Sequence, residues 1–211
     1  ELLDMIKMIS EPLQLLEIKF DNVLFGINSE GYDFDFWLAS IRYDKPARRH
    51  VPYINNPIPN RVKEALKSGL KFFTDNATKE EMNEWMQIVF ENNQTSEKEK
   101  TYLLERPGFA RSTAILKNIN MFMVNYIPRP FTAEENDIFV RFANVFEQSY
   151  VRFLDLQKAE TQARESQIEA ALEKVRSRTM AMQKSDELAD AAYVLFQQLN
   201  HLGVIHERIN I

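Results

Sequence analysis

PRPFTAEENDIFVRFANVFEQSYVRF, residues 128–153, carries the strongest structural signal in this chain, and it continues as LDLQKAETQARESQIEAALEKVRSRTMAMQ through residue 183. The two prolines at its start block a helix upstream, while Thr132 is a favourable N-cap and Glu135 completes a capping box. No Gly or Pro then follows until Gly203. An uninterrupted pattern of this length predicts one long helix that packs on a folded domain and then leaves it as a coiled coil.

The apolar spacing along this predicted helix changes from a broad stripe to a narrow seam. The stripe is wide enough to cover a sheet and consists of Ile138, Phe142, Val145, Phe146, Ser149, Phe153 and Leu156. The seam steps by four and three residues and consists of Ile168, Leu172, Val175, Thr179 and Met182. Such steps are typical of a coiled coil, so we expect two copies of the chain to pair here as a homodimer. The alternative is a single solvated helix stabilised by charge pairs between neighbouring turns.

Composition limits the classes of protein to which the chain can belong. Its 211 residues, 45% hydrophobic and 27% charged, suit one medium folded domain with helical attachments. The net charge of -5, with no basic cluster beyond Arg48-Arg49, disfavours nucleic-acid binding. The chain has 0 Cys, which excludes disulfides, a thiol nucleophile, cysteine-held metals and a thioether-linked chromophore. Because no apolar run is long enough to span a membrane and no signal peptide is found, we expect a cytoplasmic protein.

The chain before residue 128 alternates short strands and helices. A seam of apolar residues predicts an incoming helix over residues 1–16, and period-two alternation predicts two strands joined by a turn at Gly31. In order, we expect strands over residues 19–27 and 34–43, an extended piece over 50–54, a helix over 57–67, a strand over 71–76, a helix over 79–93, a polar loop over 94–100 and strands over 111–118 and 119–128. The fold class is therefore predicted to be α+β, with one antiparallel sheet and helices mainly on one side.

A further helix is predicted after the long one. Ser185 is a suitable N-cap, apolar positions from Leu188 to Leu199 share one face, and Gly203 ends the helix. The final residues could open another strand. Because the chain begins within a helical pattern and ends without a closing signal, we expect it to be a piece of a larger protein.

The segment PFTAEENDIFVRFANVFEQSYVRF, residues 130–153, resembles the closing helix of GAF domains, which follows the last pair of strands and begins with a Phe after a Pro. Its continuation is similar to the linkers between sensory domains in two-component sensor histidine kinases of the Bacteroidetes type. The resemblance covers about residues 17–203. It implies a GAF-like sensory domain, PAS-like in its layering, with a six-stranded sheet over 17–150 and a coiled-coil linker over 151–184. The helix predicted over 1–16 precedes this domain, and residues 185–211 are expected to start a following module.

This resemblance implies a module that binds a small molecule or dimerises, and that passes a signal through a dimeric helix to downstream domains of the same chain. Bilin-binding relatives use a Cys that this sequence lacks. Of the NKxnFx3DE signature of cyclic-nucleotide binders, only Phe131 and Glu135 match. The phosphoacceptor His motif and the ATP-binding glycine motifs of the kinase are not in this sequence. The identity of the small molecule is therefore left open, and no cofactor is predicted.

A GAF-like fold would place its pocket between the sheet and the segments from Arg42 to Phe90. The candidate polar contacts to a ligand are Ser40, Arg42, His50, Tyr53 and Asn55. The candidate apolar walls are Phe36, Trp37, Trp85 and Phe109. A concave apolar site with a few polar groups is what small-molecule binding requires. Any one of these aromatic residues could instead belong to an ordinary core.

No group of residues in the sequence points to catalysis. None of the three His residues is spaced as a metal ligand, and the carboxylate pairs Asp33/Asp35 and Glu80/Glu81 suit an exposed strand face and a helix N-terminus. No nucleotide-binding or hydrolase motif occurs. We therefore predict a small-molecule sensory module rather than an enzyme, with a ligand-free dimerisation or scaffold module as the alternative.

Overall fold

The structure, a computed structural model, describes residues 18–28, 32–40, 47–184 and 187–204. It divides into two compact units between Val151 and Arg152. Several features predicted from the sequence lie outside the described residues, namely the helix over 1–16, the turn at Gly31, Arg42, the N-cap Ser185 and the final strand after residue 204.

The first unit is built on a six-stranded sheet in which every pairing is antiparallel. Its strands are β1 (Asn22–Asn28), β2 (Phe34–Ser40), β3 (Ala47–Val51), β4 (Phe72–Thr78), β5 (Gly108–Ile115) and β6 (Ile119–Asn125). They lie in the order β3-β2-β1-β6-β5-β4, so that β1 and β6 form the centre. The α+β class and the antiparallel sheet predicted from the sequence are confirmed.

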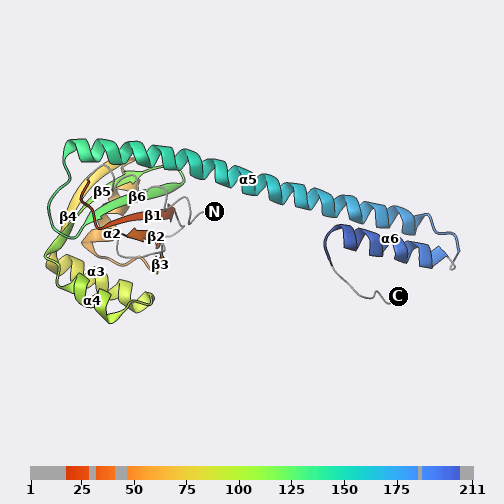
Figure 1. The fold of residues 1–211 in the computed structure, drawn as a ribbon, viewed down its shortest axis with the longest axis horizontal. Helices are drawn as coiled ribbons and strands as arrows, with labels where there is room; N and C mark the ends of the chain where they lie inside the picture. Colours follow the sequence, from red (N-terminus) through yellow and green to blue (C-terminus); the bar gives the residue numbers. More distant parts are fainter. Residues whose placement is uncertain (1–17, 29–31, 41–46, 185–186, 205–211) are drawn as a thin grey trace. The chain divides into compact units, whose positions relative to one another are not determined.

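Helices cover both faces of this sheet (Figure 1). The helices α2 (Pro57–Lys67), α3 (Lys79–Asn92) and α4 (Glu97–Leu104) belong to one side, where Trp85 of α3 meets Phe34 of β2 edge-on with ring centroids 5.8 Å apart. The first part of α5 (Ala133–Met180) covers the other, where Phe146 meets Phe25 of β1 at 4.7 Å. Three of these helices thus lie on one side, in line with the expectation that helices gather mainly on one side, while the long helix covers the second face.

Side-chain caps start the helices where the sequence predicted them. The Asn56 side chain accepts from the backbone N–H of Ile58 at the start of α2. Thr78 and Glu81 form a capping box at the start of α3, and Thr132 and Glu135 form another at the start of α5. Each box satisfies backbone N–H groups that a helix end leaves without a partner, so these boundaries are determined locally.

The polar loop predicted over residues 94–100 is wrong, because helix α4 begins there. Ser96 is its N-cap and accepts from the backbone N–H of Glu99, at 3.3 Å. Leu103 is the one buried residue of this short helix. A helix that buries so little shows no apolar periodicity, and the periodicity is the signal on which the prediction depended.

The strand predicted over residues 111–118 begins earlier, at Gly108. This glycine has φ 131°, and a Cβ atom there would stand 2.2 Å from the carbonyl oxygen of Ala77 on β4. Only glycine fits such a close approach of two backbones. The Pro107-Gly108 pair therefore opens β5.

The stripe of α5 that packs on the sheet differs in phase from the predicted one. The residues buried there are Phe139, Ala143, Phe146 and Tyr150. Of the predicted stripe only Phe146 is buried, whereas Val145 is 62% exposed and Ser149 is also exposed. Both stripes step by three and four residues, so periodicity alone does not select the one that faces the sheet.

The second unit contains the rest of α5 and helix α6 (Leu188–His201). Within it, Nη2 of Arg178 donates to Oδ2 of Asp190 at 2.7 Å, and Arg164 donates to the carbonyl oxygen of Leu202. Ala171 of α5 is buried. The helix predicted after residue 184 is confirmed, and it ends before Gly203, which has φ 78°.

Candidate functional site

A cavity of about 70 Å³ lies in the first unit between the sheet and helices α2 and α3. Alternate residues of β1, β2, β5 and β6 face it, because successive side chains of a strand point to opposite faces. The lining residues are Leu24, Phe34, Phe36, Ile58, Pro59, Trp85, Met86, Phe109, Arg111, Phe122, Val124 and Tyr126. Arg111 is the only charged residue among them, so the cavity is an apolar, largely aromatic space with one cationic group in its wall.

The guanidinium of Arg111 is held in place on one side by Asp75 of the neighbouring strand β4. Its Nε donates to Oδ1 of Asp75 at 2.8 Å, and its Nη2 donates to Oδ2 at 2.7 Å. Nη2 also donates to the backbone carbonyl of Ile58 at 3.3 Å. Both side chains are only 8% exposed. Arg111 is thus fixed by a two-pronged, charge-assisted contact, which is the strong form of an arginine–carboxylate pair.

The remaining nitrogen of this guanidinium, Nη1, has no acceptor among the described residues. Around the group, the rings of Phe73, Phe109 and Phe122 have their centroids between 5.6 and 5.9 Å from the central carbon. Aromatic faces attract a cation but do not replace a hydrogen-bond acceptor. Arg111 therefore keeps unused donors at a cavity wall.

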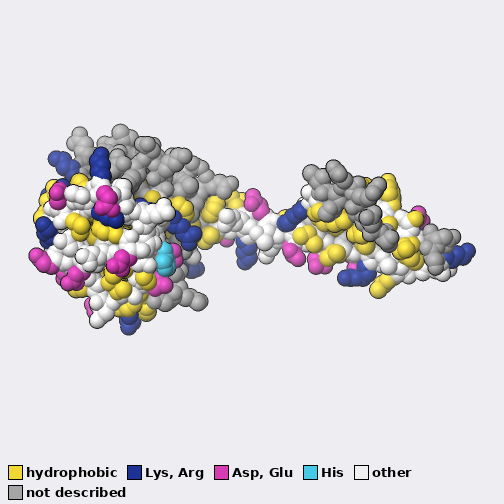
Figure 2. Space-filling view, turned by 90° about the horizontal axis from the view of Figure 1, so that it is seen from below, with side chains coloured by type: hydrophobic (Ala, Val, Ile, Leu, Met, Phe, Trp, Pro, Cys, Tyr) yellow, Lys and Arg dark blue, Asp and Glu magenta, His cyan; other side chains and the backbone are white. Residues whose placement is uncertain are grey.

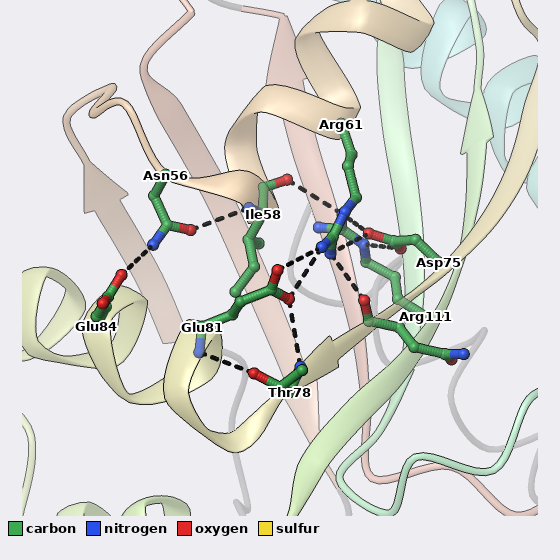
Figure 3. A network of polar contacts seen from close by, with 9 residues as sticks. Asn56, Ile58, Arg61, Asp75, Thr78, Glu81, Glu84 and Arg111 are labelled. Atoms are coloured by element: carbon green, nitrogen blue, oxygen red, sulfur yellow. Dashed lines mark hydrogen bonds and ion pairs between the residues drawn. The ribbon is translucent and has the colours of Figure 1, made fainter.

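Arg61 of α2 links the buried pair to the start of α3 (Figure 3). Its Nη1 lies 3.5 Å from Oδ2 of Asp75, and its Nη2 donates to both carboxylate oxygens of Glu81, at 2.8 and 2.9 Å. Burial lowers the pKa of Arg61, but the hydrogen bond and charge of Glu81, with the charge of Asp75, raise it above its ordinary value. The cluster of Arg61, Asp75, Glu81 and Arg111 thus contains two cations and two anions.

A second hollow of about 240 Å³ shares the wall residues Phe34, Pro59 and Phe122 with the cavity. Lys63 of α2 lines it, and the Lys63 ammonium lies over the rings of Tyr32 and Tyr53, 4.7 and 4.1 Å from their centroids. Phe34 and Phe122 therefore line both spaces.

Three of the residues predicted to contact a ligand line the cavity, namely Phe36, Trp85 and Phe109. Trp37 and His50 lie on the opposite face of the sheet, since Trp37 pairs with Phe25, whose ring packs on α5, and His50 pairs with Asp35. His50 Nδ1 is 3.2 Å from Oδ1 of Asp35. The structure does not bring these two residues to the cavity.

Two of the other predicted polar contacts, Tyr53 and Asn55, belong to a hydrogen-bonded cluster at the start of α2. Tyr53 donates its hydroxyl to Oδ1 of Asn60 at 2.7 Å, and Asn60 in turn donates to Oδ1 of Asn55 at 2.9 Å. Neither Tyr53 nor Asn55 lines the cavity. Ser40 is the last residue of β2, and its side chain, like Arg42, lies outside the described part. That any of these residues binds a ligand stays a prediction.

Sequence reasoning missed the two residues that give the cavity its polar character, Arg111 and Asp75. A weak signal was present, because each is a charged residue within a segment predicted as a strand, Asp75 near the end of 71–76 and Arg111 at the start of 111–118. Only the register of β4 against β5, which places Asp75 directly opposite Arg111, shows that they pair. That register depends on tertiary packing and is not encoded by local alternation.

The acidic pairs noted in the sequence, Asp33/Asp35 and Glu80/Glu81, make hydrogen bonds within the fold. Oδ1 of Asp33 accepts from the backbone N–H of Tyr53 at 2.8 Å. Glu80 is in the first turn of α3, where backbone and Thr78 hydrogen bonds lower its pKa. Within the described residues, no three His, Asp or Glu side chains gather as metal ligands would. None of the described helices has a stretch long and apolar enough to cross a membrane.

The predicted coiled-coil seam lies in the second unit. Leu172 is 49% exposed and Thr179 is also exposed, whereas Ile168, Val175 and Met182 are half-buried. The seam is thus partly covered within one chain and partly open. Pairing of two chains through it stays a prediction.

Comparison with known proteins adds no assignment: no family model matches the chain, and no curated protein or solved structure matches it.

Proposed function

We propose that the first unit is a GAF-like input module of a signalling protein, which binds a small molecule in the cavity and passes the signal through α5. The observation that carries this proposal is the position of strand β5 between the two. Arg111 of β5 faces the cavity, and the next residue, Ser112, faces α5. Adjacent residues of one strand point to opposite faces, so a ligand that moves Arg111 also displaces the support of the helix.

Direct hydrogen bonds fasten β5 and the turn after it to α5. Ser112 donates its hydroxyl to Oδ1 of Asn136 at 2.6 Å, and Asn136 donates to the backbone carbonyl of Phe131 at 3.3 Å. In the turn, the backbone and side-chain N–H groups of Asn118 both donate to Oε1 of Glu147, at 3.1 and 2.7 Å. These contacts support a mechanism in which β5 and α5 shift together.

The response would be a change in how two copies of α5 pair. The helix is continuous from Ala133 to Met180, so a rotation at its start can be transmitted along it. Leu172 offers apolar surface to a second chain. The residues Ala159, Ala163 and Ala170 make only a weak apolar stripe, out of phase with this seam. Weak packing allows two arrangements of similar energy, which a ligand can bias.

The ligand-binding part of the proposal is tested by native mass spectrometry on the chain purified under mild conditions. Leu24→Phe narrows the cavity from β1, while Leu70→Phe adds the same atoms at an exposed site outside it. We expect an additional small mass on the wild type and on Leu70→Phe that is lost on denaturation and is missing from Leu24→Phe. Such a mass on all three proteins would place the molecule outside the cavity.

A ligand-free scaffold is the second candidate function, and the small volume of the cavity favours it. A space of about 70 Å³ holds a few waters and is below the usual size of a ligand pocket. In that case the sheet serves only to hold α5. Masses of the protein alone, without an additional small molecule, for the wild type and both variants would favour the scaffold function.

A further inference from the structure

We infer that the cavity selects an uncharged molecule, of one ring or smaller, that offers a hydrogen-bond acceptor such as a carbonyl oxygen to Nη1 of Arg111. This inference rests on the proposed ligand-binding function and adds the chemical class of the ligand. Three observations carry it: the unused donors of Arg111, the aromatic walls and the charge balance of the cluster behind them.

The donors of Arg111 determine where a polar group of the ligand must lie. A guanidinium has five N–H groups. Those on Nε and Nη2 are used by Asp75 and by the carbonyl of Ile58, while the two on Nη1 have no acceptor among the described residues. The residue is only 7% exposed. An acceptor that enters the cavity would therefore use the N–H groups of Nη1 without displacing a hydrogen bond that Arg111 already makes.

The aromatic residues that line the rest of the cavity determine the shape and polarity of the rest of the ligand. The rings of Phe34, Phe36, Trp85, Phe109 and Phe122 line the space, and Arg111 is its one charged residue. Phe34 and Trp85 already meet edge-on, which leaves ring faces and edges available to a further flat group. An apolar, planar body fits these walls, whereas a body with several polar groups would lose its hydration without compensation.

The charge balance disfavours an anion. The cationic charge of Arg111 is already met by Asp75 at 2.7 Å, and that of Arg61 is met by Glu81 at 2.8 Å and Asp75 at 3.5 Å. No other lining residue is charged. A carboxylate ligand would therefore bring an additional negative charge into an apolar space next to Asp75. A neutral acceptor uses the same N–H groups without that desolvation penalty.

The volume sets an upper limit on size. An apolar cavity that binds benzene has about 150 Å³, roughly twice the space found here. A ring therefore requires that Phe34 or Phe122 move toward the second hollow, whose wall they also form. Without opening the whole second hollow of about 240 Å³, one ring with one acceptor is the largest ligand that fits.

The inference is tested by NMR titration of the full chain with acetophenone, benzoate and isopropylbenzene, which have closely similar shapes. We expect acetophenone to bind at least about tenfold more tightly than benzoate, and to shift the guanidinium N–H signals of Arg111 in the wild type. Isopropylbenzene should bind without shifting those signals. The Leu24→Phe variant should weaken the binding of all three probes, because it fills the cavity.

A double substitution then tests the role of the guanidinium itself. Asp75→Asn with Arg111→Gln keeps a neutral hydrogen-bonding pair, and we expect it to weaken acetophenone about tenfold while leaving isopropylbenzene unchanged. Tighter binding of benzoate than of acetophenone would overturn the preference for a neutral molecule. Binding of acetophenone without a shift at Arg111 would overturn the acceptor contact but leave the ligand-binding function standing. If no probe perturbs the cavity residues at millimolar concentration, both the inference and the proposed function fail.

Discussion

The buried pair of Arg111 and Asp75 has consequences for the stability of the fold and, under the proposed function, for ligand binding. Taking two charges out of water is unfavourable, and a buried pair is tolerated only when its geometry is good and its remaining donors are satisfied. Here the two-pronged contact satisfies the carboxylate, and Arg61 adds a third contact to it. The guanidinium is left with donors at the cavity wall. Replacing a buried ion pair by apolar residues is often neutral or stabilising, and the proposed ligand contact at Arg111 would account for the presence of the pair.

Removing only the Arg111 cation should therefore destabilise the fold. We expect Arg111→Met to lower the free energy of unfolding by about 3–5 kcal/mol, because Asp75 is left as a buried charge with only Arg61 nearby. The double substitution Asp75→Asn with Arg111→Gln should lower it by about 1–2 kcal/mol, since no unpaired charge remains. Urea unfolding of the two variants checks this. Equal losses in the two proteins would show that the charge of Asp75 is not the cause.

The lowered pKa of Glu135 predicts how the stability of the fold depends on pH. Burial raises its pKa, but the backbone N–H of Thr132 and the side chain of Arg129 outweigh this and lower the pKa from its ordinary value of 4.5. The folded state thus favours the charged form. Its stabilising contribution is complete above pH 4.5 and is lost as the pH falls below that value through the lower folded pKa.

We therefore expect Glu135→Gln to lower the free energy of unfolding by about 1 kcal/mol at pH 7, as for the loss of a helix cap. Below pH 4.5 the difference from the wild type should shrink steadily as Glu135 becomes protonated. Urea unfolding at several pH values between 3 and 7 measures it. A difference that is the same at pH 3 and at pH 7 would exclude a role for the carboxylate charge.

At the scale of helices and strands, the sequence predicts well those features that depend only on residues close together in the chain. The capping box at Thr132 needs residues only three apart and was predicted, and the structure has a second such box at Thr78. Helix α4 was missed because it buries little more than Leu103. The face of α5 was misassigned because two apolar stripes lie side by side on it, and only the sheet beneath selects one.

Two neighbouring residues test that assignment. Phe146 is buried against the sheet and contacts Phe25, whereas Val145 is largely exposed. We expect Phe146→Ala to lower the free energy of unfolding by about 3–5 kcal/mol, and Val145→Ala to change it by about 0.5 kcal/mol or less. Thermal unfolding compares them. A large loss in the Val145 variant would mean that a partner chain or another segment covers this face.

At the scale of the whole molecule, the fold class could be predicted from the sequence. The residues of the candidate site could be predicted only in part. Alternation predicted the central strands and Phe36 within one of them, whereas Phe109 lies before the strand predicted over 111–118 and was proposed from the family resemblance; both line the cavity. Whether a wall residue meets a cavity depends on side chains brought together from β1, β2, β5 and β6, which no local pattern contains. Figure 2 adds that acidic and basic side chains are interspersed over the face it displays, with no continuous basic area among its described residues.

Ligand binding and helix response are separate properties, and the proposed function requires both. Hydrogen–deuterium exchange of the full chain with and without acetophenone measures them together, because it reports on local opening of each segment. We expect acetophenone to slow exchange in β5 and β6 and to change exchange over residues 133–151 of α5 in the wild type. Neither change should occur in Leu24→Phe. Protection of β5 and β6 with unchanged exchange over residues 133–151 would contradict the coupling of the cavity to the helix.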